Sequence, residues 1–309
     1  MGATSHLAKS LIYCLARENS RYKLRLFTRR PALALDFLAS NTSHRGSDDA
    51  CLIIKDYDHF LDGEYDAIIN CVGIGTIKKH QGEYSKYFTV YEYFDNLAID
   101  YLHKHTRTRY ISLGSGSVYG SHFEHPAEEF SIHALPVNKL PKESYYSISR
   151  LYSEAKHRSM ENLDIIDFRI FSFFSRFHDP ADAYLMDQII TAIQQKSPLQ
   201  TTRDDFYRDY LHPLDLYQAI CSAMTCEQPI NGAYDLCSKQ PILKSEMLAF
   251  FEKQYRLRVS YTDSVIEKSA TGQKSSYFSS YRESGPINYQ PDFSSLDALS
   301  EESAHLLAT

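Results

Sequence analysis

The chain is short of several features that define common protein classes: it has few glycines, no CxxC pair of cysteines and no long hydrophobic run. No stretch approaches the roughly 20 apolar residues that cross a bilayer, and the start, MGATSHLAKSL, lacks the apolar core of a signal peptide. Lysine and arginine (33) do not exceed aspartate and glutamate (39), which disfavours nucleic acid and anionic lipid as partners. We therefore expect a cytoplasmic globular protein that binds neither membrane nor nucleic acid.

Cysteine and histidine show no pattern of a cross-linked or metal-binding protein. The six cysteines are scattered, and several lie inside apolar runs, so free and mostly buried thiols are expected. The 13 histidines lack the spacing of HExxH or Cys/His motifs. The sequence therefore predicts no metal site.

The order of apolar segments indicates an α/β fold. In the first half, strand-like runs at 22–29, 51–56, 65–73 and 109–120 alternate with helix-like segments at 2–18, 32–39 and 84–105. A second series follows with helices at 144–160, 184–195, 213–224 and 245–255 and strands at 164–174 and 233–238. Strands that alternate with helices predict a doubly wound parallel sheet of the Rossmann type.

This pattern suggests two domains. We expect residues 1–167 to form the nucleotide-binding domain, with a segment near 207–238 that returns to it. Residues 168–309 would mostly form a smaller α/β domain for the substrate, packed over the carboxyl edge of the sheet, where open α/β folds bind ligands.

The few glycines are not evenly distributed. The chain has 12, about 4% against an average near 7%. Half of them fall at predicted strand ends: Gly2, Gly73, Gly75, Gly114, Gly116 and Gly120. Glycine lets the backbone approach a ligand closely, so this distribution favours a bound nucleotide at the edge of the sheet.

Six segments in a fixed order resemble the motifs of one family. They are GATSHLA (2–8), YDAIINCVG (65–73), SLGSGSVYG (112–120), YYSISRLYSE (145–154), FRIFSFFSR (168–176) and YRDYLHPLDLYQAI (207–220). In this order they resemble the extended short-chain dehydrogenase/reductases, the NAD(P)-dependent epimerase/dehydratase group. The resemblance implies a bound NAD(P), a nucleotide-sugar substrate and the paired homodimers common in that group.

The resemblance also implies a catalytic set. Ser115 falls on the family's catalytic serine or threonine, and Tyr146 falls on its proton-transfer tyrosine. The family's lysine, four residues on, is here Arg150. Four residues make about one helical turn, so Tyr146 and Arg150 share a face. Arginine supplies a permanent charge, but its planar fork is not equivalent to a lysine ammonium.

The cofactor-binding positions implied by the resemblance are Gly2, Thr4, Ser5, His6, Leu7, Arg29, Arg30, Asp56, Tyr57, Val72, Gly73 and Ser172. The phosphate turn departs from the family, because Ser5 and Ala8 stand where it has glycines. At the end of the strand 22–29, where NAD enzymes of this fold usually have an acidic residue, Arg29 and Arg30 suit a 2′-phosphate. We therefore expect NADP rather than NAD, with NAD as the alternative.

Two residues are expected to contact the substrate. Arg208 matches the arginine that binds the substrate's phosphates in related enzymes, and its fork fits a diphosphate. The alternative for Arg208 is a salt bridge to Asp209 or Asp215. Ser117 follows Ser115 in the same loop, where related dehydratases carry the acidic residues that perform elimination. Dehydration is therefore disfavoured.

The first strand of the predicted sheet is not visible. In a Rossmann sheet this central strand precedes the phosphate turn, yet only Met1 stands before Gly2. Neighbouring strands would then expose backbone hydrogen-bonding groups in mid-sheet. We expect that the sequence lacks about six residues at its amino end; the alternative is a damaged fold.

Two function classes follow from these observations. The first is an NAD(P)-dependent enzyme that performs 4-epimerization or 4-keto reduction of a nucleotide-activated sugar by hydride transfer, with a tyrosine as acid or base. The second is a catalytically degenerate NAD(P)-binding regulator or complex subunit of the same fold, which the changes at Ser5, Arg150 and Ser172 favour.

Overall fold

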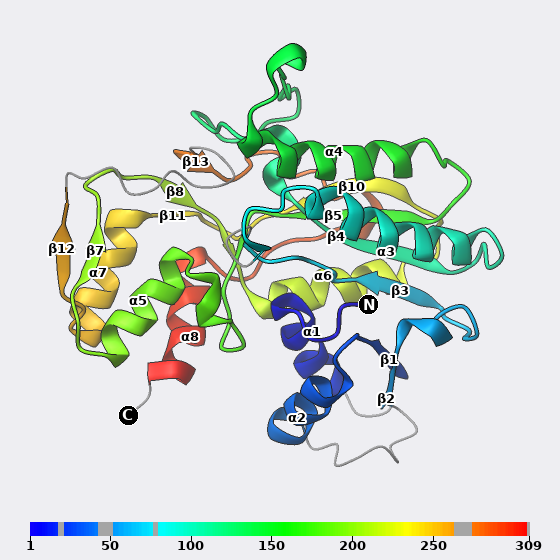
Figure 1. The fold of residues 1–309 in the computed structure, drawn as a ribbon, viewed down its shortest axis with the longest axis horizontal. Helices are drawn as coiled ribbons and strands as arrows, with labels where there is room; N and C mark the ends of the chain where they lie inside the picture. The colour runs from blue at the N-terminus through cyan, green and yellow to red at the C-terminus, as the bar shows by residue number, and fades with distance from the viewer. Residues whose placement is uncertain (18–21, 43–51, 77–79, 263–273, 308–309) are drawn as a thin grey trace.

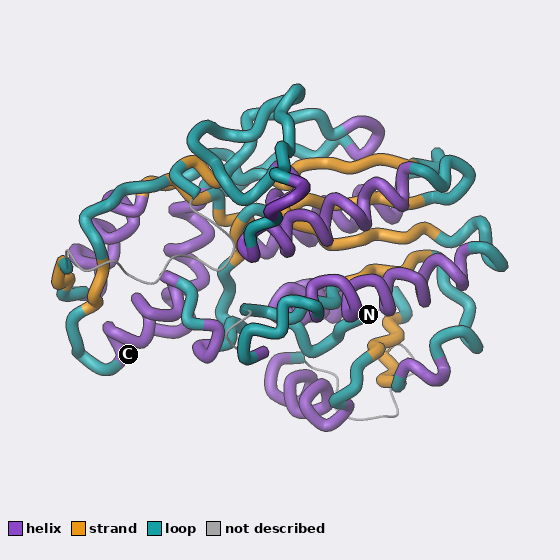
Figure 2. Tube along the Cα trace, turned by 45° about the horizontal axis from the view of Figure 1, so that its top comes forward, coloured by secondary structure: helices purple, strands orange, loops and turns teal. Residues whose placement is uncertain are grey.

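A computed structural model describes residues 1–17, 22–42, 52–76, 80–262 and 274–307. It contains a parallel sheet with helices on both faces and a second, mostly helical lobe (Figures 1 and 2). This arrangement confirms the predicted α/β class. None of the described helices is long and apolar enough to span a membrane.

The main sheet has the strand order β10-β5-β4-β3, and all of its pairs are parallel. Its strands are β3 (Ala67–Asn70), β4 (Arg109–Ser115), β5 (Ile165–Ile170) and β10 (Asn231–Leu236). A separate parallel pair joins β1 (Leu24–Phe27) to β2 (Leu52–Lys55). All but one residue of β4 is buried, as expected for a strand covered on both faces.

Helices cover both faces of the main sheet (Figure 1), and alternate residues of β4 pack against opposite layers. Ile111 and Leu113 of β4 share a core with α1 (His6–Arg17) and α6 (Pro213–Thr225). Tyr110 lies on the other face, in a core with α3 (Lys86–Leu102), which also contacts α4 (Tyr145–Arg158). The helix α2 (Pro31–Asn41) packs against β2.

Residues 1–3 lie between the two sheets. The Met1 amino group donates to the Ile69 carbonyl at 2.7 Å, and the Cys71 amide donates to the Met1 carbonyl at 3.1 Å. On the other side, the Ala3 amide donates to the Phe27 carbonyl at 3.1 Å. These three residues therefore occupy the place where the sequence predicts the end of a central strand, and the first strand of the described chain follows α1.

The second lobe is built from three helices and several short strands. Its helices are α5 (Leu185–Gln194), α7 (Lys244–Tyr255) and α8 (Ser295–Leu307). Its strands are β6 (Ser172–Phe173), β7 (Leu199–Thr201), β8 (Tyr207–Arg208), β9 (Tyr210–Leu211), β11 (Ile242–Leu243), β12 (Val259–Tyr261) and β13 (Ser276–Tyr277). Its core includes Met186, Ile189, Phe251 and Leu299. The sequence patterns predict α5 and α7 but miss α8 and most of the short strands.

Two details differ from the sequence predictions. The strand expected at 109–120 ends at Ser115, because Gly116–Tyr119 forms a 3-10 helix, η3. The five described cysteines are free as predicted, but only Cys71 and Cys237 are fully buried. The other three, Cys14, Cys221 and Cys226, are half-buried, so the expectation of mostly buried thiols was wrong for them.

A compact charge network ties α3, α4 and the sheet together. His157 of α4 is completely buried, and its two ring nitrogens lie 2.8 Å from carboxylate oxygens of Asp95 and Asp167. Tyr110 donates to Asp95 at 2.8 Å. Lys156 pairs with Asp95, and Arg158 pairs with Asp167. Burial alone would lower the pKa of His157, but the two carboxylates outweigh it and raise the pKa to about 9.

Candidate active site

Ser115 stands where β4 ends and the chain turns into η3. Its hydroxyl accepts a hydrogen bond from the Ser117 amide at 3.2 Å, which caps the 3-10 turn. The same hydroxyl lies 3.1 Å from the Tyr277 hydroxyl, which also lies 3.0 Å from the Ser117 hydroxyl. The end of β4 therefore presents two serine hydroxyls that share one phenol.

Tyr146 and Arg150 lie side by side in the first turns of α4. The Arg150 guanidinium is 5.4 Å from the centre of the Tyr146 ring and 3.7 Å from that of Tyr91. Arg150 is only 9% exposed, and its Nε has no hydrogen-bond partner among the described residues. Arginine keeps its proton in such surroundings. A fixed positive charge with one free donor thus lies beside the predicted acid/base tyrosine.

Aromatic rings from α3 hold this face of α4. The Tyr146 ring packs 5.0 Å from Tyr87 and 6.4 Å from Tyr91, centre to centre. Burial raises the pKa of Tyr91 to about 12, although Arg150 acts in the opposite direction. Tyr91 is therefore a neutral phenol at neutral pH, suited to stack on a cation.

Tyr277 connects the serine side of the site with the tyrosine side. Burial raises its pKa to about 12, and Tyr146 is near enough to add to that rise. Tyr277 belongs to β13, which runs parallel to β8. A segment from the end of the chain thus brings Ser115 and Tyr146 into one cluster, although no direct hydrogen bond between these two is observed.

The predicted phosphate turn precedes α1. Gly2 has φ +71°, and a Cβ at this position would lie 2.9 Å from the Val72 amide nitrogen, so only glycine fits. The Ser5 hydroxyl accepts from the Ala8 amide at 3.3 Å. Thr4 lies 3.4 Å from Thr28 through their hydroxyl oxygens. Leu7 packs against the core under α1.

Tyr57 fixes the same turn. Its hydroxyl accepts from the Gly2 amide at 2.7 Å and donates to the Phe27 carbonyl at 3.2 Å. Burial raises the pKa of this phenol to about 12. The adjacent Asp56 is exposed at the end of β2. Tyr57 therefore holds the turn to β1, a role that the sequence reading did not include.

His6 begins α1 directly after the turn, and Ser172 begins β6. The His6 ring lies 2.8 Å from the Ser175 hydroxyl and packs edge-on against Phe173 at 5.0 Å. Burial lowers the pKa of His6 to about 4, so the ring is neutral at neutral pH. Ser172 donates its amide to the Asp209 carbonyl at 2.9 Å, within the β6/β9 pair.

The remaining predicted cofactor residues lie at exits from strands. Arg29 and Arg30 are exposed between β1 and α2, and the Arg29 guanidinium lies 5.9 Å from the Phe94 ring. The Val72 amide donates to the Asn70 side chain at 3.0 Å. Gly73 is exposed, and a Cβ there would meet nothing within 4 Å.

Arg208 does not form the salt bridge considered as its alternative role. Its guanidinium donates to the backbone carbonyls of Tyr207 and Lys274, each at 2.7 Å. The carboxylate of Asp209 accepts from the Ser238 amide, and that of Asp215 accepts from the Asp292 amide. Burial lowers the pKa of Arg208. Within the described residues, Arg208 is a half-buried cation without an ion-pair partner.

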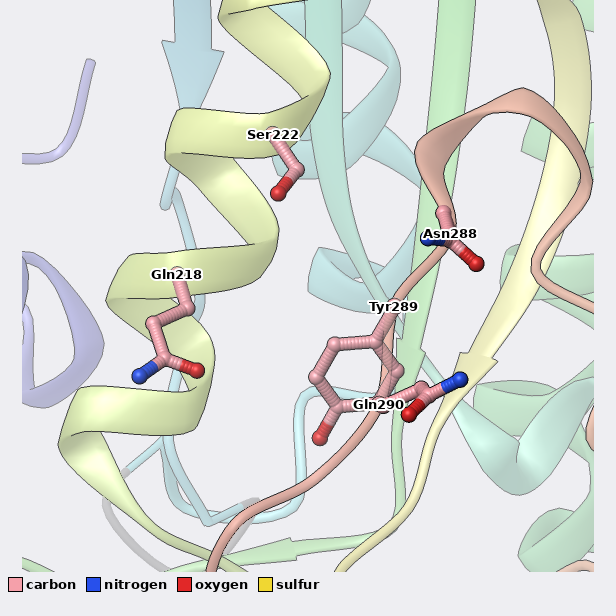
Figure 3. A pocket seen from close by; sticks show the side chains of 5 residues that line it. All are labelled: Gln218, Ser222, Asn288, Tyr289 and Gln290. Atoms are coloured by element: carbon pink, nitrogen blue, oxygen red, sulfur yellow. The ribbon is translucent and has the colours of Figure 1, made fainter.

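A pocket elsewhere on the surface carries no comparable chemistry (Figure 3). It lies between α6 and the segment 288–290 and is lined by Gln218, Ser222, Asn288, Tyr289 and Gln290. The Tyr289 hydroxyl donates to the Cys237 carbonyl at 2.8 Å. Among the described residues, no group of three or more His, Cys, Asp or Glu side chains is arranged to hold a metal ion.

The cluster is compatible with a bound dinucleotide. The Gly2 turn leaves room for no Cβ, Gly73 faces open space, and Arg150 has an unpaired buried Nε beside Tyr146. A family model described as the NAD dependent epimerase/dehydratase family matches residues 3–237. The chain belongs to this family. This result confirms the resemblance seen in the sequence motifs.

Solved structures of other proteins share the fold of this chain over almost its whole length. A UDP-glucuronic acid 4-epimerase from Bacillus cereus, in complex with UDP-glucuronic acid and NAD, is 16% identical with a TM-score of 0.75, covering 98% of this chain and 96% of that one. A UDP-N-acetylglucosamine 4-epimerase from Methanobrevibacter ruminantium is 13% identical with a TM-score of 0.76, covering 99% and 96%. No curated protein matches the chain.

Sequence reasoning missed part of this family member's cluster. Lys274 and Tyr277 come from a tail rich in serine and tyrosine, where neither periodicity nor a family motif drew attention. Tyr87 and Tyr91 lie on one side of α3, four residues apart, and were interpreted only as part of a helix. Their helical spacing was visible, but its relation to Tyr146 required the contact between α3 and α4.

Proposed function

We propose that this protein is an NAD(P)-dependent enzyme that epimerizes or reduces the 4-position of a nucleotide-activated sugar. The observation that carries the proposal is the buried guanidinium of Arg150, 5.4 Å from the Tyr146 ring, with one unpaired donor. Family membership and the nearby hydroxyl of Ser115 support it.

In this proposal, each side chain has a separate task. Tyr146 gives a proton to the sugar oxygen, or takes one from it, with the permanent charge of Arg150 beside its ring. Ser115 donates a hydrogen bond to the same oxygen and fixes its position. Bound NAD(P) would supply hydride transfer. The unpaired Nε of Arg150 would hold the cofactor's ribose in place of the lysine found in relatives.

The proposed cofactor is NADP, with NAD as the alternative. Arg29 and Arg30 are exposed after β1 and are free to bind a 2′-phosphate. The Bacillus cereus epimerase was solved with NAD, which keeps the alternative open. Around the pyrophosphate we assign Gly2, Thr4 and Ser5 at the start of α1. Asp56 and Tyr57 would border the adenine.

A nucleotide sugar is the proposed substrate because the cluster offers groups for both of its ends. Arg208 is a half-buried cation with no carboxylate partner among the described residues, and it would bind the diphosphate. Ser117 would contact the sugar next to Ser115. The similar structures include 4-epimerases for UDP-sugars, which agrees with this choice.

The test combines cofactor titration with turnover. NADPH and NADH are titrated while cofactor fluorescence is followed, and 4-hydroxy and 4-keto nucleotide sugars are then added. We expect turnover that falls about 100-fold or more in Tyr146→Phe, the range typical of a general acid or base. Tyr145→Phe is the matched control, because Tyr145 packs against Tyr84 and Phe88 instead.

One observation favours the alternative of a binding module without catalysis: the Ser115 hydroxyl already pairs with Tyr277. Cofactor binding without turnover of any sugar would establish that alternative. Retention of full turnover in Tyr146→Phe would refute the assignment of the acid/base residue. Two variants test whether the cation at position 150 serves catalysis. Arg150→Lys, which restores the family residue, should preserve turnover, whereas Arg150→Met should abolish it.

A further inference from the structure

Lys274 is a buried cation beside the proposed catalytic hydroxyls. It is 9% exposed, and its Nζ donates to the Ser117 hydroxyl at 2.8 Å. The ammonium also lies 4.0 Å from the centre of the Tyr277 ring. Because the Tyr277 hydroxyl also pairs with Ser115, Lys274 is linked through Tyr277 to the Ser115 hydroxyl.

The backbone around Lys274 is held firmly in place. The Arg208 guanidinium donates to the Lys274 carbonyl at 2.7 Å, and Lys274 forms a β-bridge with Phe123. The next residues continue into β13, whose partner is β8. The contacts with Arg208 and Phe123 therefore fix the backbone of Lys274 so that its side chain reaches Ser117.

No negative charge among the described residues balances this ammonium. Its partners are the Ser117 hydroxyl and the rings of Tyr277 and Phe123. The charged group that acts on it electrostatically among the described residues is another cation, Arg208. Burial and Arg208 together lower the pKa of Lys274 to about 7. A buried charge that lacks a counter-ion destabilises the folded protein, so a ligand that supplies one has an energetic advantage.

We propose that Lys274 binds an anionic substituent on the sugar, and that the substrate is a nucleotide-activated acidic sugar such as a hexuronate. This assignment rests on the proposed function, since it names the substrate class of the same site. A carboxylate on the sugar fits because Lys274 contacts Ser117, beside Ser115, whereas Arg208 remains for the diphosphate. A carboxylate would accept charge-assisted hydrogen bonds from the ammonium.

The test compares sugars that differ only in their charge at C6. Binding of UDP-glucose and UDP-glucuronic acid, and of GDP-mannose and GDP-mannuronic acid, is measured by calorimetry at pH 6.5 with the cofactor-loaded protein. We expect the acidic member of one pair to bind about 10- to 100-fold more tightly than the neutral one. UDP and GDP alone measure the contribution of the diphosphate.

Variants show whether Lys274 causes the preference. In Lys274→Gln the advantage of the acidic sugar should vanish while the affinity for the neutral sugar is preserved, and Lys274→Arg should recover part of it. Lys253→Gln, at an exposed position of α7, is the control and should keep the wild-type preference. A purely structural role would weaken both sugars equally.

Three results would overturn the proposal. Equal binding of neutral and acidic sugars contradicts the assignment but leaves the proposed function intact. If Lys274→Gln weakened the binding of UDP or GDP alone as much as it weakened the binding of the acidic nucleotide sugar, Lys274 would bind the diphosphate and not the sugar. Failure of all four sugars to bind, with cofactor bound normally, would reject the proposed function together with this substrate class.

Discussion

Two groups of buried charges in this protein differ in whether the described residues supply counter-ions. Around His157, two carboxylates are matched by an imidazole, Lys156 and Arg158, and Tyr110 completes the hydrogen bonds. Around Lys274, two cations share neutral partners and no carboxylate of the described residues. In the first arrangement each buried carboxylate has cationic partners within the chain, and the group joins α3 and α4 to the sheet.

In the second arrangement, around Lys274, only a bound anionic ligand would supply the counter-ion. A folded chain retains such an imbalance at a cost in stability, which ligand binding can offset. The comparison thus separates charges that hold the fold from charges that await a ligand. It predicts opposite effects when the central cation of each group is replaced by an apolar residue of similar size.

The largest effect is expected at His157. His157→Leu leaves the buried carboxylates of Asp95 and Asp167 without their shared partner. Removal of one member of a buried ion pair typically costs 3–5 kcal/mol, and because Lys156 and Arg158 remain, we expect about 3 kcal/mol of lost stability. Urea unfolding at pH 6.5 measures it. His103→Leu, at an exposed position after α3, is the control; a loss at His157 no larger than in this control would contradict a balanced network.

Replacement of Lys274 should have the opposite sign and a smaller size. Lys274→Met removes a buried ammonium that lacks a counter-ion and fills the space with an apolar chain. We expect a gain of about 2 kcal/mol in unfolding free energy at pH 6.5, in the range seen when buried charges are replaced by apolar residues. Lys253→Met serves as the control. A destabilised Lys274→Met would show that the lysine supports the fold, and the contrast with His157 would fail.

The two groups also differ in how far the sequence could reveal them. Alternating apolar runs predicted the strands of the sheet and most of its helices, because burial on both faces leaves a strong local signal. The family motifs pointed to Ser115, Tyr146 and Arg150, which the structure places in one cluster with Tyr277. Their roles, and the division into domains near residue 167, stay predictions.

Other parts lie beyond local patterns. Lys274 contacts Ser117 across 157 residues of sequence, and the segment that carries it has no periodicity. The strands β8, β9 and β13 are two residues long, too short for an alternation to show. The helix α8 follows a serine-rich tail and was overlooked, although its apolar residues have helical spacing. The Lys274–Ser117 contact and the two-residue strands depend on tertiary contacts, which local sequence patterns do not reveal.

The smallest effect, and the most discriminating, is the slope of stability against pH between 7 and 8. His157 has a folded pKa of about 9 against about 6.5 unfolded, so its contribution is complete below pH 6.5 and is lost as the pH rises through 9. Lys274 has a folded pKa of about 7 against 10.5, so the folded state binds fewer protons above pH 7 and stability rises with pH.

In the wild-type protein these two slopes, each about 1 kcal/mol per pH unit, oppose each other and should nearly cancel. His157→Leu should therefore become more stable from pH 7 to pH 8, whereas Lys274→Met should become less stable over the same interval. Urea unfolding at four pH values across this window measures both slopes. If the unfolding free energy changed with pH in the same direction in both variants, the description of these two groups would be wrong. The pH dependence would then come from a titrating group that both variants retain, and not from Lys274 in one and His157 in the other.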